Sequence, residues 1–265
     1  MAGSRQSRVN AAEPVRIPPR GVRVLTATAE GKWFTVKPTY WHVIAVRMSS
    51  CAYPARKGPT MSDPVKLAVV YYSATGTNTE VAKVLAETAE KAGAEVRVRR
   101  VAELAPQAAI DSNPAWAANH AASADIAVAT PEDIEWADAV IFGSPTRFGN
   151  ISSQLKQFID TLGGLWAQGK LADKVYSGFV SSATRHGGQE STLLALYNSF
   201  HHFGGIVVAP GYTDPVKFAD GNPYGTSHID AQGNNPVNDE TRDAARVQAD
   251  RVVRIARQLK AGAAA

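Results

Sequence analysis

A short loop rich in hydroxyl groups is the first feature of this 265-residue sequence that could bind a ligand. Ser73, Thr75 and Thr77 lie with Gly76 directly after an apolar run and directly before a helical pattern. Such a loop offers hydroxyls and backbone N–H groups at a helix N-terminus, where the helix dipole favours an anion. It matches neither a Walker A loop nor the G-x-G-x-x-G turn of dinucleotide-binding folds. It suits a terminal monophosphate, as in FMN, although an ordinary strand–turn–helix connection capped by Thr77 or Asn78 is the alternative.

Two more polar loops follow predicted strands. Residues 144–150 read Ser-Pro-Thr-Arg-Phe-Gly-Asn, and residues 181–190 end in Gly-Gly-Gln-Glu. In a parallel sheet with helices on both faces, ligands bind beyond the carboxyl ends of the strands, where the strand order reverses. The three loops are therefore expected to converge on one ligand site.

Strand and helix patterns alternate through the part of the chain after residue 60, with turn signals between them. The predicted strands are residues 66–73, 95–100, 138–143, 174–182 and 206–209. The predicted helices are residues 79–92, a helix that starts at Pro131, residues 152–161 closed by Gly163 and Gly164, a helix that ends near His202, and residues 239–260. Residues 106–131 are predicted to be irregular with at most a short helix, and residues 210–238 to be a long loop. This alternation predicts an α/β fold with right-handed crossovers. We expect a flavodoxin-like, doubly wound, five-stranded parallel sheet of order 2-1-3-4-5 with helices on both faces.

The charge of the chain is divided unevenly between two segments. Residues 1–60 carry 10 Lys and Arg against two Glu, whereas acidic residues outnumber basic ones in residues 61–265. The basic segment resembles a transit peptide or a basic arm in composition, but a translated stretch upstream of a true start at Met61 is favoured. We therefore expect residues 1–60 to be a disordered or mis-assigned extension and residues 61–265 to be the FMN-binding domain. Nucleic acid is not an expected partner, because the folded part is acidic.

The cysteine content and the hydropathy of the sequence limit the cellular compartment and the types of site that we expect. The single cysteine, Cys51, lies in the basic segment, so a reducing, cytoplasmic environment is expected. No run of about 18 apolar residues is present, so no membrane span is expected. No group of His, Cys, Asp and Glu has the spacing of a metal site, and no nucleophile lies in a Ser-His-Asp or Cys-His arrangement.

Five motifs taken together resemble the WrbA family. They are Tyr71-Tyr72-Ser73, Gly-Ser-Pro-Thr-Arg-Phe-Gly-Asn at 143–150, Gly-Gly-Leu-Trp at 163–166, residues 181–190, and Pro-Tyr-Gly at 223–225. The family consists of flavodoxin-like NAD(P)H:quinone oxidoreductases that bind FMN and assemble as tetramers. The resemblance covers about residues 64–262.

The resemblance implies a set of binding residues in the three loops and on two helices. For the FMN phosphate it implies Ser73, Ala74, Thr75, Gly76, Thr77 and Asn78. For the isoalloxazine ring it implies Pro145, Thr146, Arg147, Phe148, Gly149 and Asn150, with a third flavin loop of Ser182, Ala183, Thr184, Arg185, His186 and Gly187. His202 matches a histidine that contacts the flavin of a neighbouring subunit in the family, Trp166 matches an aromatic residue of the substrate pocket, and Thr75 matches a position associated with the nicotinamide cofactor.

Some residues depart from the family pattern or have a simpler interpretation. Phe203 replaces the second histidine of the family's His-His-Gly segment, and Arg185 and His186 occupy positions that are usually small. The effect of these bulky side chains on FMN affinity or on the choice between NADH and NADPH is not predicted. Trp166 has an alternative role as a core residue at the end of a helix.

The sequence and the resemblance together predict an FMN-dependent NAD(P)H:quinone oxidoreductase that works as a cytoplasmic homotetramer. Quinones would be reduced to hydroquinones by hydride transfer through flavin N5, with NADH or NADPH as the electron donor. No catalytic residue is assigned, because the flavin itself carries this chemistry. The alternative is a flavodoxin-like FMN electron carrier without a substrate of its own.

Overall fold

A computed structural model describes residues 25–27, 33–35 and 63–263 of the chain. The chain divides into two compact units, Met1–Lys57 and Gly58–Ala265. In the first unit, β1 (Leu25–Ala27) and β2 (Trp33–Thr35) pair as antiparallel strands, which the sequence analysis did not predict. The remainder of the predicted 1–60 extension lies outside the described residues. Among the helices of the described part, none is both long and apolar enough to cross a membrane.

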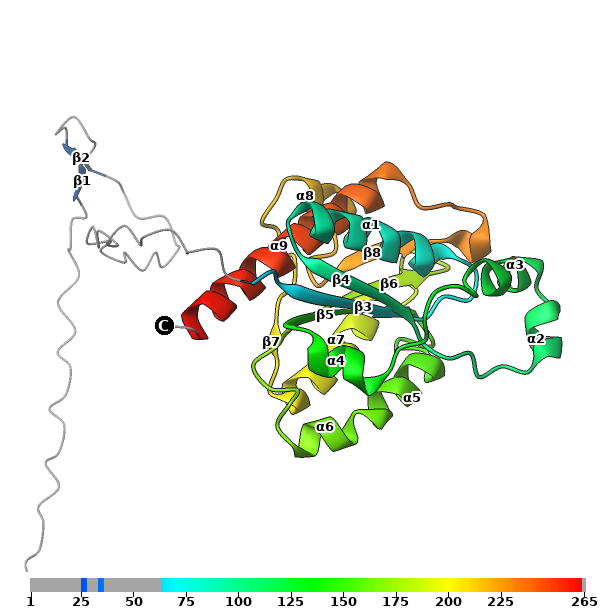
Figure 1. Cartoon of the computed structure of the whole chain (residues 1–265). Helices are drawn as coiled ribbons and strands as arrows, with labels where there is room; N and C mark the ends of the chain where they lie inside the picture. The colour runs from blue at the N-terminus through cyan, green and yellow to red at the C-terminus, as the bar shows by residue number, and fades with distance from the viewer. Residues whose placement is uncertain (1–24, 28–32, 36–62, 264–265) are drawn as a thin grey trace, which may run out of the picture. The chain divides into compact units, whose positions relative to one another are not determined.

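The second unit is built on a parallel sheet with the strand order β4-β3-β5-β6-β7 (Figure 1). The strands are β3 (Lys66–Tyr71), β4 (Glu95–Arg100), β5 (Ala139–Pro145), β6 (Val175–Ser182), β7 (Ile206–Val207) and β8 (Thr226–Ile229). In chain order the first five follow the pattern 2-1-3-4-5, so the predicted flavodoxin-like topology is confirmed. The strand order reverses between β3 and β5, and the hydroxyl-rich loop follows β3 at that point.

A sixth strand corrects the prediction of a five-stranded sheet. β7 has two residues and pairs only with the start of β6, at Val175 and Tyr176, whereas β8 pairs with its end, from Phe179 to Ser182. The predicted strand 206–209 is therefore too long, and the predicted loop 210–238 contains α8 (Val216–Asp220), β8 and a 3₁₀ turn, η1 (Ala231–Gly233). β8 lacks an apolar run, and it pairs only because Gly225 allows a close approach. A Cβ at Gly225 would lie 2.2 Å from the Gly178 carbonyl oxygen.

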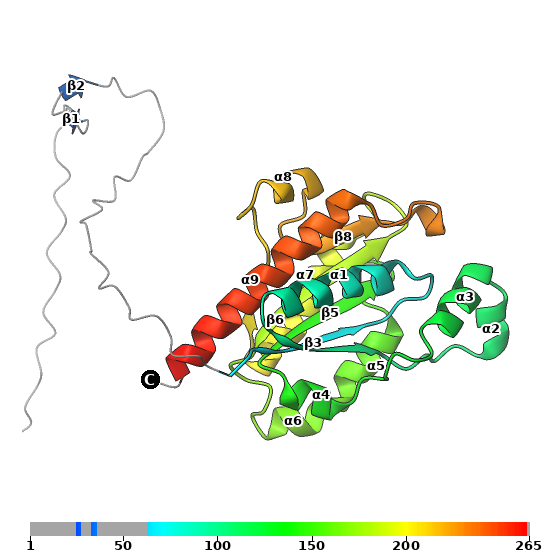
Figure 2. The same ribbon diagram turned by 45° about the horizontal axis from the view of Figure 1, so that its top comes forward.

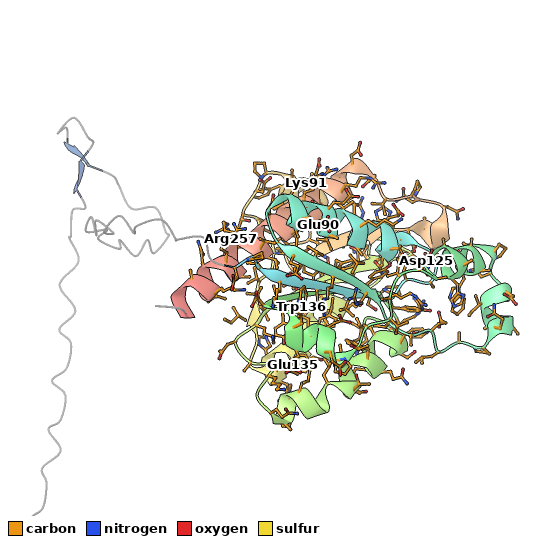
Figure 3. All side chains as sticks on the ribbon, viewed as in Figure 1. Glu90, Lys91, Asp125, Glu135, Trp136 and Arg257 are labelled. Carbon is orange, nitrogen blue, oxygen red and sulfur yellow. The ribbon has the colours of Figure 1, made fainter. Side chains whose placement is uncertain are left out.

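Helices cover both faces of the sheet (Figure 2). α1 (Thr77–Lys91) and α9 (Asp239–Ala263) pack on one face, and α4 (Pro131–Trp136), α5 (Ser153–Thr161) and α7 (Gln189–Phe203) on the other. Alternate residues of β3 point into the two cores, with Val69 on the α1 side and Val70 on the α5 side. Arg257 of α9 donates a hydrogen bond to the Ala92 carbonyl just after α1, 2.6 Å away (Figure 3).

Two helical segments differ from the prediction, and one predicted helix start is confirmed. Residues 106–131 contain two helices, α2 (Gln107–Asp111) and α3 (Pro114–Ala122), where at most one short helix was predicted. Gly163 does not close a helix, because α6 (Gly163–Ala167) begins there after α5 has ended at Thr161. The predicted start at Pro131 is confirmed, with Thr130 and Asp133 forming a capping box.

The carboxylate of Glu103 connects the end of β3 to α3 and α5. It accepts hydrogen bonds from Tyr72 Oη at 2.8 Å, Trp116 Nε1 at 3.1 Å and Gln154 Nε2 at 2.9 Å, and from the backbone N–H of Ala105 at 3.0 Å. Burial raises the pKa of Glu103, but the hydrogen bonds from Ala105, Gln154, Tyr72 and Trp116 outweigh it, so the net pKa lies below its usual value. The ionised form of Glu103 therefore holds these segments together.

A carboxylate with a lowered pKa in the folded state contributes stability above its unfolded pKa and loses it as the pH falls. Glu103→Gln should therefore lower the free energy of unfolding at pH 7 by about 1 kcal/mol, a low value because the group is partly exposed to solvent. Below about pH 4 the difference between the variant and the wild type should shrink. Urea denaturation from about pH 2.5 to pH 7 measures this across the titration of a carboxyl group, with the exposed Glu90→Gln in α1 as the control. A difference that stays constant over this pH range would contradict the role of the ionised carboxylate.

Candidate functional site

The loop after β3 opens the N-terminus of α1 to a cavity. Gly76 is the N-cap residue, with a left-handed φ of 98°, and no side chain caps the helix. Thr77 and Asn78 lie inside the helix, so the alternative of an ordinary turn capped by either of them is not observed. Asn78 is buried and instead donates a hydrogen bond to the Tyr72 carbonyl, at 3.1 Å. The first turn of α1 is thus left available to an anion.

Asn119 of α3 fixes the conformation of this loop, and the sequence analysis missed it. Its amide nitrogen donates to the carbonyl oxygens of Ser73 at 2.8 Å and Ala74 at 3.1 Å. Its amide oxygen accepts from the Thr79 hydroxyl at 3.2 Å. These hydrogen bonds join residues 40 or more positions apart in the chain, so no local sequence signal indicates them.

The three predicted loops surround one cavity of about 480 Å³. This volume lies in the usual range of ligand sites, about 300–1,000 Å³. The predicted residues that line it are Ser73, Ala74, Thr75, Thr77, Asn78, Pro145, Thr146, Arg147, Ser182, Ala183, Thr184 and Gly187. The lining also includes four residues that were not predicted, Asn113, Ser181, Asp230 and Gln232. Of these, Ser181 directly precedes a predicted residue, and the other three lie in segments predicted to be irregular.

The second loop forms a tight turn with an aromatic residue at its tip. Arg147 and Asn150 exchange backbone hydrogen bonds of 2.7 and 3.1 Å, which leaves Phe148 and Gly149 at the tip with positive φ. The Phe148 side chain is fully exposed and does not line the cavity. Its left-handed backbone conformation is strained for a residue other than glycine. The N–H groups of Gly149 and Asn150 are used within the turn, at Thr146 Oγ1 and at the Arg147 carbonyl.

Hydrogen bonds from α7 hold the second and third loops. Thr192 shares a 2.8 Å hydrogen bond with the hydroxyl of Thr146. Gln189 donates to Ser182 Oγ at 2.8 Å, and that hydroxyl donates to the Thr184 carbonyl at 2.7 Å. Both loops are therefore fixed from the same helix N-terminus.

Four predicted residues lie outside this cavity, in two other hollows of the surface. Arg185 and His186 of the third loop line a separate polar cavity. Trp166 and His202 lie together in a mostly apolar groove of about 330 Å³ between α5, α6 and α7, where Trp166 Nε1 donates to the His202 carbonyl at 2.8 Å. Within one chain, Trp166 and His202 are thus not brought to the three loops. Gly76, Gly149 and Asn150 were also predicted to bind the cofactor, but they do not line the cavity either.

The residues around the cavity fit an FMN molecule. The charged residues in its lining are Arg147 and Asp230. Residues 73–78 form its polar end near α1, where they contribute hydroxyls and helix N–H groups and carry no carboxylate. A phosphate is stabilised by such donors, and the remaining wall offers backbone and hydroxyl groups from the second and third loops. The arrangement can hold an anionic, elongated cofactor with one ring system at the strand ends.

Comparisons with known proteins agree with this geometry. Residues 65–215 match the family model described as NADPH-dependent FMN reductase. A Deinococcus radiodurans protein named NAD(P)H dehydrogenase (quinone) is 50% identical over 200 residues, which cover 75% of this chain and 99% of that protein. A protein of the same name from Sinorhizobium fredii is 45% identical over 202 residues, or 73% of this chain and 98% of that protein.

Among solved structures, a flavodoxin described as a WrbA-like protein from Agrobacterium tumefaciens is similar to this chain. Its TM-score is 0.52 at 26% identity, and the match covers 73% of this chain and 98% of that one. The sequence relatives, the family model and this structure agree on one assignment. The chain belongs to the NADPH-dependent FMN reductase family, and its resemblance to the WrbA family of flavodoxin-like proteins is confirmed.

Proposed function

We propose that this protein is an FMN-dependent NAD(P)H:quinone oxidoreductase. The observation that carries the proposal is the convergence of three loops, each after a parallel strand, on one cavity at an uncapped helix N-terminus. The relatives named NAD(P)H dehydrogenase (quinone) span the same part of the chain. The alternative of an electron carrier without a substrate is not favoured, because these relatives are named as enzymes.

Each loop has its own part in holding the cofactor. Residues 73–78 would hold the phosphate through the hydroxyls and the first turn of α1. The turn around Thr146 and Arg147 would bind the ring and its polar edge, together with Ser182, Ala183, Thr184 and Gly187 of the third loop. FMN supplies two-electron hydride transfer when it is bound, so the chain needs to position substrates and exclude water rather than provide an acid or a base.

The substrates would reach the ring from the side of the exposed turn. Phe148 is fully exposed and directly follows Arg147, which lines the cavity, and such an aromatic ring can stack on a nicotinamide or a quinone. Thr75 lines the cavity and is the predicted contact of the nicotinamide donor. The donor and the quinone would occupy the same place in turn, in a reducing cytoplasmic compartment.

The oligomeric state is part of the proposal because two predicted binding residues, Trp166 and His202, lie away from the FMN cavity of their own chain. Trp166 is 56% exposed in the apolar groove that also contains His202 and the partly buried Phe203. A second copy of the chain that covers this groove would bring these side chains next to a neighbour's flavin. We therefore propose a homotetramer whose sites are completed between subunits.

The direct test of the function is donor oxidation with and without a quinone. The purified protein loaded with FMN should oxidise NADH or NADPH rapidly when benzoquinone is present, and form one hydroquinone for each donor. A protein that binds FMN but shows no benzoquinone-dependent oxidation would instead be a carrier, which would contradict the proposal.

Asn119 should act as a positioning residue for the phosphate loop. Asn119→Leu removes two hydrogen bonds to loop carbonyls, so the loop is no longer fixed in the unbound protein. FMN binding must then also pay the entropy of ordering the loop. We expect FMN affinity to fall about 10- to 30-fold, as for the loss of one to two net hydrogen bonds. Flavin fluorescence quenching measures the affinity, and hydrogen exchange of residues 73–78 should become faster. Gln107→Leu, which removes an exposed amide in the neighbouring α2, is the matched control. Unchanged exchange together with unchanged affinity would rule out this role.

The shared site can be tested by dilution. Activity per subunit should fall at concentrations where the tetramer dissociates, and FMN should raise the tetramer fraction because it binds the assembled form better. His202→Ala should weaken FMN binding and assembly together, by about 1–3 kcal/mol, whereas His201→Ala at the neighbouring exposed position should not. Light scattering beside quinone reduction across a dilution series measures both quantities. A monomer with full activity would exclude a site completed between subunits.

A further inference from the structure

A second polar cavity lies beside the FMN cavity, on the other side of the third loop. Its volume is about 450 Å³, again within the range of about 300–1,000 Å³ that small-molecule sites occupy. Its walls come from the third loop, the start of α7, the end of α8, β8 and the start of α9. No role in the proposed function uses this space.

The two cavities share a wall that is a single stretch of chain. In the third loop, Ser182, Thr184 and Gly187 line the FMN cavity, whereas Arg185 and His186 line the second one. The same division recurs at the end of β8, where Ile229 lines the second cavity and Asp230 the first. An elongated ligand that crosses this wall can therefore place one end in each cavity.

The charged side chains at the mouth of the second cavity are suited to a nucleotide. Arg185 is exposed and has no hydrogen bond or ion pair with another residue of the described part of the chain, so its guanidinium is available to a phosphate. Glu190 and Glu240 line the same cavity and are also exposed. Ionised carboxylates accept hydrogen bonds from the hydroxyls of a ribose.

The deeper wall contains a buried donor without an acceptor. Asn222 is 2% exposed, and its amide oxygen accepts from the Tyr224 N–H at 3.1 Å, which fixes the orientation of the amide. Within the described residues, its amide nitrogen has no hydrogen-bond partner. A buried donor of this kind is costly when unpaired, and an acceptor atom of a purine base would relieve it after a small shift of the wall.

Several other polar groups of this wall are already paired within the described residues. The buried Lys217 and Asp220 form an ion pair, which holds the end of α8. His228 faces the Asn235 carbonyl with Nε2 and the Thr241 hydroxyl with Nδ1, at 2.9 Å each. Because a carbonyl only accepts, Nε2 carries a hydrogen and donates it to Asn235, while Nδ1 and the Thr241 hydroxyl share the second hydrogen bond. These groups shape the cavity, and the side chains available to a ligand include Arg185, Glu190, Glu240 and Asn222, together with His186 and Ser227 of the same lining.

We infer that the second cavity binds the adenosine half of the nicotinamide dinucleotide while the nicotinamide half lies in the FMN cavity. Arg185 contacts a phosphate of the linker, the two glutamates contact the ribose, and the base lies against the Asn222 wall. The inference rests on the proposed function, because the reductant is what connects the two cavities. A free adenine nucleotide has the same chemistry, so the test must separate these two sources.

The test compares NADH with reduced nicotinamide mononucleotide, which lacks the adenosine half, as donors for benzoquinone reduction by the FMN-loaded protein. In wild type, KM should be at least about tenfold lower for NADH, the equivalent of one charged hydrogen bond. Ala219→Trp fills the cavity from its exposed rim on α8. It should raise KM for NADH about tenfold and leave KM for the mononucleotide and the FMN affinity unchanged. Phe218→Trp, at the neighbouring exposed position outside the cavity lining, is the matched control and should change neither.

A measurement on wild type covers the case in which Ala219→Trp does not fold. 5′-AMP should compete with NADH but not with the mononucleotide. Equal KM values for the two donors, or no competition by 5′-AMP, would overturn the inference while quinone reduction itself continues. A change by 5′-AMP of kcat with the mononucleotide would assign the cavity to a free regulatory nucleotide and would also overturn it. Oxidation of neither of these donors, nor of NADPH, would contradict the proposed function and, with it, this inference.

Discussion

The uncapped first turn of α1 is the feature on which the rest of the site depends. A helix that starts with Ser, Thr, Asp or Asn satisfies its own N–H groups, but Gly76 has no side chain with which to do so. Its left-handed backbone turns the chain from β3 into the helix and leaves the positive end of the helix dipole facing the cavity. An anion at this point stabilises the helix and is itself stabilised. The chain therefore needs no lysine or arginine within residues 73–78.

The loops around the cavity are fixed by contacts with distant segments, which favours a preformed site. Asn119 from α3 holds the loop after β3, and Glu103 connects α3 and α5 to Tyr72 at the end of that strand. Thr192 and Gln189, both in α7, hold the other two loops. Ligand binding to loops that are already ordered costs less conformational entropy. Phe148 differs from these ordered contacts. Its strained backbone conformation leaves an aromatic ring exposed next to the cavity-lining Arg147.

The sequence predicted what depends on local pattern and missed what depends on long-range contacts. The strands β3, β5 and β6 and the three loops after them were predictable because apolar runs end abruptly at glycine and hydroxyl residues. β4 was predictable because apolar and charged residues alternate along it. β8 was not, because Thr226–Ile229 has no apolar run, and its pairing with β6 depends on the close approach at Gly225. Asn113 and Asp230 lie in segments without a clear period, and only the fold brings them to the cavity. The fold likewise brings Asn119 to the loop after β3. The separation of Trp166 and His202 from the cavity likewise follows from the positions of α6 and α7, which no sequence pattern fixes.

The central claim is that the phosphate of FMN is bound by the first turn of α1 and the hydroxyls of its loop. The most direct measurement compares the affinities of the apoprotein for FMN and for riboflavin, which differ only in that phosphate, by flavin fluorescence quenching. Two charged hydrogen bonds to the phosphate should make FMN bind at least about 100-fold more tightly. Equal affinities for FMN and riboflavin would contradict the account, because the N-terminus of α1 would then contribute nothing to recognition of the cofactor.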